Sequence, residues 1–154
     1  MGVEIAIVCD DADFVQLQAL LDEYEESLPP DLRHGSVPDM ASLRATYAEP
    51  NAAFLARVGR DVAGCVGLVA RDGTSAIVQR LYAKPSFRGQ GVGRGLVGTV
   101  IDCARRCGYR RVVLDTHAER LPAAYALYRS LGFSDCDPYG SVDYACPTYM
   151  ELRL

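Results

Sequence analysis

The hydrophobic residues change their spacing along the chain, and each spacing predicts an element. Residues 4–9 form a short apolar run that suits a strand, and one of the aspartates at 10–13 supplies the N-cap of a helix. Apolar side chains recur at helical spacing through residues 14–28, and two prolines end that helix. Residues 38–47 predict a second, shorter helix. Residues 29–37 between the helices form either a mobile substrate loop or an inert connector.

Three apolar runs in the middle of the chain predict antiparallel strands. Residues 53–58 and 62–70 are joined by Gly-Arg-Asp at 59–61, which is typical of a hairpin. An Arg-Asp-Gly turn at 71–73 then leads into a third strand at 74–83. We therefore expect a continuous antiparallel unit of three strands.

A helix and a strand follow this unit and predict a crossover. Apolar side chains line one face of a helix at 92–107, and residues 112–114 form a fully apolar strand. A strand, helix and strand of this length form a right-handed connection, which places the two strands parallel. Residues 122–131 predict a further helix that begins at a proline, and alternation at 150–154 predicts a final strand.

The glycine-rich stretch 88–95 opens directly into the helix of this crossover. Free backbone amides, the helix dipole and the lack of Cβ atoms make such a position suitable for binding an anion. Arg88 and Arg94 add positive charge, so we expect a ligand that carries phosphate. No lysine follows the glycines, as a Walker loop would require. A dinucleotide fingerprint, G-x-G-x-x-G with a later acid, occurs formally within the helical pattern at Gly93, Gly95, Gly98 and Asp115.

Composition narrows the class of protein. The 154 residues, 49% of them hydrophobic, correspond to one domain over residues 1–154. A net charge of -4 with dispersed arginines argues against nucleic acid as a partner, and no run is long enough to cross a membrane. Because no signal peptide is visible and the six cysteines lack metal-binding spacing, we expect a reduced cytoplasmic protein without a metal. Cys103 and Cys107 share a helix face and are expected to be small buried side chains.

Three motifs together resemble the GNAT N-acetyltransferase superfamily. R-x-x-G-x-G at residues 88–93 matches its phosphate loop, and residues 80–85 match the strand before that loop. Residues 112–116 match the strand after its helix, and residues 126–133 match its L-Y-x-x-x-G-F helix. The resemblance implies an α/β (α+β) fold, the GNAT acyltransferase fold. Its sheet is mixed and mostly antiparallel, with a parallel splayed pair at the centre, and helices flank it.

The resemblance also implies acetyl-CoA as co-substrate. Its pantetheine arm would lie between the splayed strands and pair with backbone amides of the first strand, and its phosphates would lie on the glycine loop. The cofactor-binding residues implied in this way are Leu81, Tyr82, Ala83, Arg88, Gly89, Gln90, Gly91, Val92, Gly93 and Arg94.

Acetyl transfer to an amine requires a neutral nucleophile and a proton for the departing thiolate. Tyr128 matches the family's position for that acid, although a tyrosine on a helix also suits a core position. Many family members carry a glutamate on the strand before the phosphate loop, but this chain has only Gln79 and Arg80 as polar residues there. The general base is left open between Asp115, His117 and water.

The acceptor is expected to be a primary amine of a small molecule or a protein, and a homodimer is compatible with the sequence. The polar and aromatic residues expected opposite the cofactor are Tyr24, Arg80, Tyr139 and Tyr144. Arg80 would either bind an acceptor carboxylate or pair with a nearby acid. Two alternatives to an enzyme stay open, a non-catalytic acyl-CoA-binding module and a dinucleotide-binding domain.

Overall fold

The computed structural model describes residues 2–154, which form one sheet of seven strands in the order β1-β2-β3-β4-β5-β7-β6. The strands are β1 (Val3–Ile7), β2 (Ala52–Val58), β3 (Asp61–Ala70), β4 (Ser75–Ala83), β5 (Arg111–Thr116), β6 (Ser134–Asp135) and β7 (Thr148–Arg153). The helices are α1 (Asp11–Ser27), α2 (Met40–Thr46), α3 (Val92–Arg106) and α4 (Pro122–Ser130), with 3-10 turns at Pro30–Leu32 and Pro85–Phe87.

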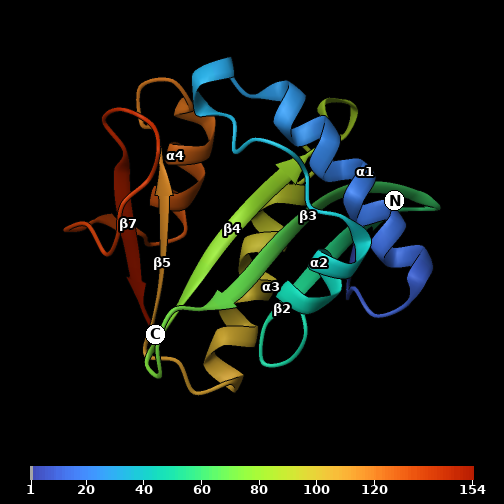
Figure 1. Ribbon diagram of the computed structural model, residues 1–154, viewed down its shortest axis with the longest axis horizontal. Helices are drawn as coiled ribbons and strands as arrows, with labels where there is room; N and C mark the ends of the chain where they lie inside the picture. The colour runs from blue at the N-terminus through green and yellow to red at the C-terminus, as the bar shows by residue number, and fades with distance from the viewer. Residues whose placement is uncertain (1) are drawn as a thin grey trace.

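Every strand pair in the sheet is antiparallel except β4 with β5, which is parallel. In the sequence, α3 connects these two strands. This parallel pair is short. Its last partners are Ile77 and Val113, and beyond them the two strands separate toward their C-terminal ends (Figure 1). The predicted fold class is therefore confirmed, including the splayed parallel pair near the centre of the sheet.

The helices cover the two faces of the sheet and create two cores. α1 and α2 lie on one face, in front of β3 and β4 in Figure 1, and α3 lies behind them. Leu96 and Val100 of α3 are fully buried on their side, and Leu17 and Leu21 of α1 are buried on the other. β2 and β3 lie between the two layers, so both faces of these strands are apolar and their sequences form continuous hydrophobic runs.

β4 contains an irregularity beside the point where it leaves β5. Its pairing with β3 shifts between the partners Cys65–Tyr82 and Gly67–Gln79, so Arg80 and Leu81 lie in a bulge. Arg80 has a φ of 56°, a left-handed conformation that is uncommon for a residue with a side chain. The bulge changes the direction of the side chains that follow Gln79.

Three features differ from the sequence prediction. The two-residue strand β6 was not predicted, because Ser134 and Asp135 are both exposed and have no apolar pattern. The predicted burial of Cys103 and Cys107 is wrong for Cys107, which is exposed, while Cys103 is half-buried. The α3 helix ends at Arg106, two residues before Gly108, which has a left-handed φ of 84°, so Cys107 lies at the exposed end of the helix.

Candidate functional site

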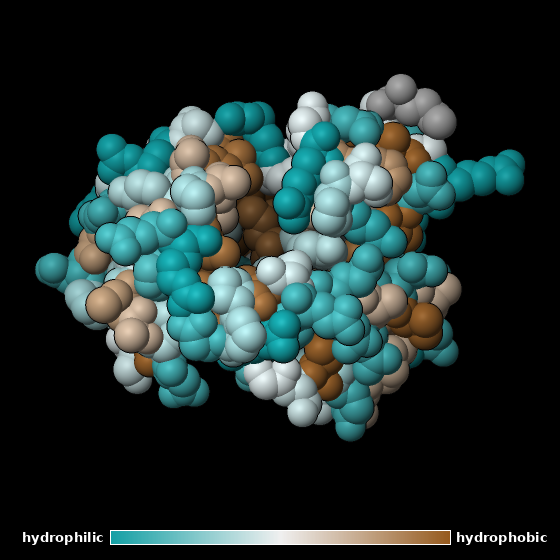
Figure 2. Space-filling view, turned by 90° about the horizontal axis from the view of Figure 1, so that it is seen from above, coloured by the Kyte–Doolittle hydropathy of each residue, from teal (hydrophilic) through white to brown (hydrophobic). Residues whose placement is uncertain are grey.

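A pocket of about 1060 Å³ opens where β4 and β5 separate. Its walls come from β4 and β5, the end of α1 and the turn after it, the start of α3, α4, and the loop at 139–144. Figure 2 looks down on the molecule from above, and the hollow has an apolar floor between hydrophilic flanks. Among the residues predicted to bind cofactor or acceptor, all line this pocket except Gln90, whose side chain is exposed.

The glycine loop forms one end of the pocket. Gly89 and Gly91 both have a φ of 82°, and Gly91 is the N-cap residue of α3, so the first amides of the helix are free to bind a ligand. Arg88 is exposed beside them. Arg94 lies in the first turn of the helix and donates to the Ser130 hydroxyl at 2.8 Å, which connects α3 to α4. This end of the pocket therefore suits an anionic group such as a phosphate.

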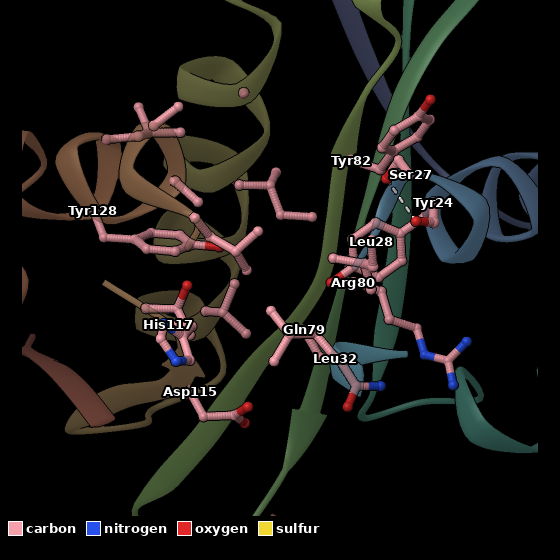
Figure 3. A pocket seen from close by; sticks show the side chains of 18 of the residues that line it. Tyr24, Ser27, Leu28, Leu32, Gln79, Arg80, Tyr82, Asp115, His117 and Tyr128 are labelled. Atoms are coloured by element: carbon pink, nitrogen blue, oxygen red, sulfur yellow. Dashed lines mark hydrogen bonds between the residues drawn. The ribbon is translucent and has the colours of Figure 1, made fainter. Parts of the chain in front are cut away.

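Tyr128 of α4 points into the space between β4 and β5 (Figure 3). It is 7% exposed, packs against Phe133, and has no hydrogen-bond partner for its hydroxyl among residues 2–154. Burial raises the pKa of Tyr128, and the nearby Tyr24 and Asp115 raise it further. The phenol is therefore fully protonated at neutral pH, and the hydroxyl is available to a ligand.

Asp115, near the end of β5, is the half-buried carboxylate in the pocket. Its two oxygens accept hydrogen bonds from the Tyr139 hydroxyl at 3.2 Å and the Tyr144 hydroxyl at 2.6 Å. Burial raises the pKa of both tyrosines, and the Asp115 carboxylate raises it further. The loop after β6 thus closes over Asp115 and places two predicted acceptor-side tyrosines against it.

His117 follows β5 and is 8% exposed. Its Nδ1 accepts a hydrogen bond from the backbone N–H of Arg120 at 3.2 Å. In the neutral ring the proton is then on Nε2, so Nδ1 is occupied and Nε2 is a donor. The choice of general base between Asp115, His117 and water stays a prediction.

Gln79 lies opposite Asp115, with the gap between the strands separating their side chains (Figure 3). Its Nε2 donates to the Tyr47 hydroxyl at 2.9 Å, which fixes the amide. The Tyr47 ring lies directly over Gly67, where a Cβ would be 2.7 Å from the ring, so only glycine allows this packing. Sequence reasoning missed Tyr47, because nothing in the run 38–47 distinguishes it from an ordinary helix-end tyrosine.

Tyr24 and Arg80 complete the wall opposite Tyr128 (Figure 3). The Tyr24 ring stacks on His34 at a centroid distance of 5.8 Å and lies 5.9 Å from the Tyr82 ring. His34 is held in turn by Glu25, whose Oε1 lies 2.7 Å from the His34 Nδ1. The turn after α1 is therefore connected to the helix by polar contacts. Whether residues 29–37 move with substrate stays a prediction.

Three further observations concern metal ligands, membrane-spanning helices and the glycines of α3. Across residues 2–154, no group of three or more His, Cys, Asp or Glu side chains is arranged to hold a metal ion. Within the same range, no helix is both long and apolar enough to cross a membrane. Gly93, Gly95 and Gly98 all lie inside α3 rather than at a turn between strand and helix, which does not fit a dinucleotide fingerprint.

Comparisons with known proteins concern the family and the fold. Residues 17–133 match the model of the Acetyltransferase (GNAT) family. An uncharacterized N-acetyltransferase of Schizosaccharomyces pombe is 32% identical over 99% of this chain and 96% of its own length. An IAA acetyltransferase of Azospirillum brasilense is 38% identical over 62% of this chain, which spans 63% of that protein.

Solved structures share the fold. An acetyltransferase of Salmonella typhimurium, solved with its cofactor acetyl-CoA, has a TM-score of 0.79 at 22% identity, covering 99% of this chain and 94% of that one. At this identity the similarity concerns the fold alone. The family model spans most of the chain and includes the glycine loop, β5 and α4, and the fission-yeast relative extends the match over nearly its full length. The chain therefore belongs to the GNAT family of acetyltransferases.

Proposed function

We propose that this protein is an acetyl-CoA-dependent N-acetyltransferase that transfers an acetyl group to a primary amine by direct attack, with Tyr128 as the acid. The observation that carries the proposal is the Tyr128 hydroxyl, which points into the gap between β4 and β5 and has no partner among residues 2–154. A hydroxyl that opens onto the pocket without a protein partner is free to donate to a reacting group.

Acetyl-CoA fits the residues that are present. The left-handed Gly89 and Gly91 and the start of α3 would bind the pyrophosphate, with Arg88 adding charge. The edge of β4 that faces β5 has no strand partner beyond Ile77, so the backbone of Leu81–Ala83 would pair with the amides of pantetheine. The Salmonella typhimurium structure with its cofactor acetyl-CoA supports this placement through its shared fold.

With acetyl-CoA bound in this way, the residues that line the pocket have distinct roles in the reaction. The thioester supplies the acetyl group and a thiolate leaving group. Asp115 from β5 and Gln79 from β4 orient the amine, and Asp115 takes up or relays the proton that the amine must lose before attack. The Tyr128 hydroxyl donates to the sulfur as the carbon–sulfur bond breaks. The products are the acetylated amine and free CoA thiol, with one proton released overall.

The strand before the loop has no carboxylate, and this observation favours a second candidate, a non-catalytic acyl-CoA-binding module. Both candidates predict that acetyl-CoA and CoA raise the thermal denaturation midpoint. Only the enzyme predicts release of free thiol when an amine is added, measured with a thiol reagent across a panel of amines. Stabilisation by CoA with no thiol release from any amine would favour the binding module, and stabilisation by NAD instead of CoA would refute both.

A further inference from the structure

We propose that the acceptor is a small amine that also carries an anionic group, as a free α-amino acid does. Asp115 and Gln79 bind its amino group, and Arg80 binds its anion. This inference rests on the proposed function, because it concerns the acceptor half of the same pocket. It assigns roles to three side chains that line the pocket where the strands separate, Gln79, Arg80 and Asp115.

The amine position follows from the strand register. Gln79 and Asp115 each lie two residues beyond the last paired residues, Ile77 and Val113, so they occupy equivalent places on β4 and β5 where the strands begin to separate. Side chains two apart on a strand share a face. Their neighbours Val78 and Leu114 belong to the core beneath α3, so Gln79 and Asp115 lie on the α1 side of the sheet. In Figure 3 Asp115 lies on the β5 side of the gap and Gln79 on the β4 side.

Both of these side chains line the pocket and carry acceptor oxygens. Asp115 receives only hydroxyl donors, from Tyr139 and Tyr144, and has no ion pair with a Lys, Arg or His among residues 2–154. Gln79 uses its Nε2 to donate to Tyr47, which leaves Oε1 as its free polar atom. Two opposed acceptors, one of them charged, match the three donors and the positive charge of an ammonium group.

The anion position follows from how the pocket arginines are used. Five arginines line the pocket, and three of them donate to groups of the protein itself. These are Arg33 with the carbonyls of Leu28 and Glu26, Arg94 with the Ser130 hydroxyl, and Arg120 with the Asp31 carboxylate. Arg88 belongs to the phosphate loop. Within residues 2–154, Arg80 is the acceptor-side arginine whose guanidinium has neither an ion pair nor a hydrogen bond.

The backbone at Arg80 strengthens the assignment. Its φ of 56° lies in the left-handed region, and such conformations in residues other than glycine concentrate at functional sites. The Arg80 carbonyl, in the bulge of β4, accepts a hydrogen bond at 3.5 Å from the thiol of Cys65, which is buried on the neighbouring strand β3. The bulge thus fixes Arg80 next to Gln79 on one wall, while Asp115 lies on the other. The sequence left open whether Arg80 pairs with an acid, and no described residue supplies one.

The Asp115 carboxylate and the Arg80 guanidinium together favour an acceptor that carries both a positive and a negative charge. A cation with no anion inside a pocket favours a ligand that supplies the missing charge, and a planar guanidinium suits a carboxylate in particular. A simple amine would satisfy Asp115 and leave Arg80 unpaired. In the reaction the amino nitrogen bonds to the acetyl carbonyl carbon, the carbon–sulfur bond breaks, the sulfur takes a proton, and the ammonium loses one to solvent through Asp115. The carboxylate remains bound to Arg80 throughout.

The test compares α-amino acids with their carboxamides, which keep the amine and remove the negative charge. Thiol release from acetyl-CoA is measured for each matched pair. We expect kcat/KM to favour the amino acid by about ten- to a hundredfold, the range for a hydrogen-bonded charged group, mainly through KM. Arg80→Gln should remove this preference by raising KM for the amino acid alone, and Arg80→Lys should restore part of it. Arg60→Gln, which removes an exposed positive charge at the β2–β3 turn, is the matched control.

The outcomes separate this inference from the proposed function. Equal turnover of acids and amides, or a preference that survives Arg80→Gln, would overturn the inference and leave the acetyltransferase intact. Release of no thiol with any amine, in a protein that binds CoA, would refute the proposed function and the inference with it. If Arg80→Gln does not fold, the wild-type preference is measured against salt instead. A preference that does not shrink as ionic strength rises would contradict a charge pair.

Discussion

At the scale of single residues, Tyr128 separates an enzyme from a binding protein. Tyr128→Phe keeps the ring that packs on Phe133 and removes only the hydroxyl. We expect CoA affinity and the denaturation midpoint to stay near wild type, and kcat to fall by about 10² to 10⁴, as for general acids. The loss should appear in kcat rather than in KM for acetyl-CoA, because the proton is needed only as the bond to sulfur breaks. The change in kcat is measured as steady-state thiol release in an assay limited by chemistry. A kcat equal to that of wild type would show that Tyr128 is a packing residue and not the general acid.

The environment of Tyr128 also predicts a pH dependence. Burial raises its pKa above the ordinary value of 10.0, so the phenol holds its proton to higher pH than a tyrosine in water does. A group with a raised pKa is protonated throughout the range below its folded pKa. Activity that depends on this proton should therefore persist through pH 10 rather than decline there. A kcat profile with an alkaline fall near pH 10 that disappears in Tyr128→Phe would contradict this assignment of the shift.

The glycines of the loop have different reasons to be glycine. Gly91 has a φ of 82° and open space around its Cβ position, whereas Gly98 has the same open space and lies in the middle of α3. Gly91→Ala forces a left-handed alanine, at a cost of about 1–2 kcal/mol, and places a methyl group where phosphate would approach. CoA affinity should fall by at least about tenfold. Gly98→Ala is the control, and it should stabilise the helix by up to about 1 kcal/mol without changing affinity.

The residue-level chemistry of the pocket could be predicted only in part. Arg88, Gly91 and Tyr128 were predicted as site residues because each belongs to a local motif, and all three line the pocket. The hydrogen bond of Gln79 to Tyr47 and that of Asp115 to Tyr144 join residues about thirty positions apart, 32 and 29, and no local pattern encodes them. The bulge at Arg80 was not predicted either, because two adjacent polar residues, Gln79 and Arg80, do not by themselves distinguish a bulge from a regular strand.

At the scale of elements, the turn between β3 and β4 depends on a single carboxylate. One oxygen of Asp72 accepts from the Thr74 amide at 2.8 Å, the Thr74 hydroxyl at 3.0 Å and the Ser75 amide at 2.8 Å. These hydrogen bonds, and chiefly the one from the Thr74 amide, lower the pKa of Asp72 from 3.8 to about 2. The stabilisation is therefore complete above pH 3.8 and is lost as pH falls toward 2.

This linkage makes a prediction for Asp72→Asn. The variant should have a lower denaturation midpoint than wild type at pH 6, and the difference should shrink as the pH falls through 4 toward 2. Thermal melts monitored by circular dichroism at several pH values measure it. Asp61→Asn, at the exposed start of β3, is the control for loss of one negative charge. A difference between Asp72→Asn and wild type that is the same at every pH would show that shape rather than charge matters at this turn.

Most elements were predictable because their signals are local. α1 begins after Asp10, whose side chain accepts from the Asp13 amide, and α4 begins at Pro122, as the capping rules require. The predictable strands are those with long apolar runs, since β2 and β3 lie between two helical layers. β6 is two residues long and is held by β7, so its existence depends on a partner that follows it in the chain.

At the scale of the whole molecule, the fold was predicted by combining periodicity with the resemblance to a family. Periodicity gave the three antiparallel strands and the crossover, and the resemblance gave the separation of β4 from β5. Physical rules alone would have paired those strands to their ends, because parallel neighbours in a sheet normally stay together. That residues 1–154 form one domain, act in the cytoplasm or form a homodimer stays a prediction.

Because β4 and β5 separate early, the sheet has two unpaired strand edges in its interior in addition to the edge strands at its two sides. Beyond Ile77 and Val113, each strand has a side with no neighbouring strand. Unpaired backbone of this kind is a template for any extended chain, including that of another molecule. We expect the ligand-free protein to aggregate faster on mild heating than the CoA-saturated one, as measured by light scattering. The cellular supply of cofactor would then set the lifetime of the protein as well as its rate of turnover.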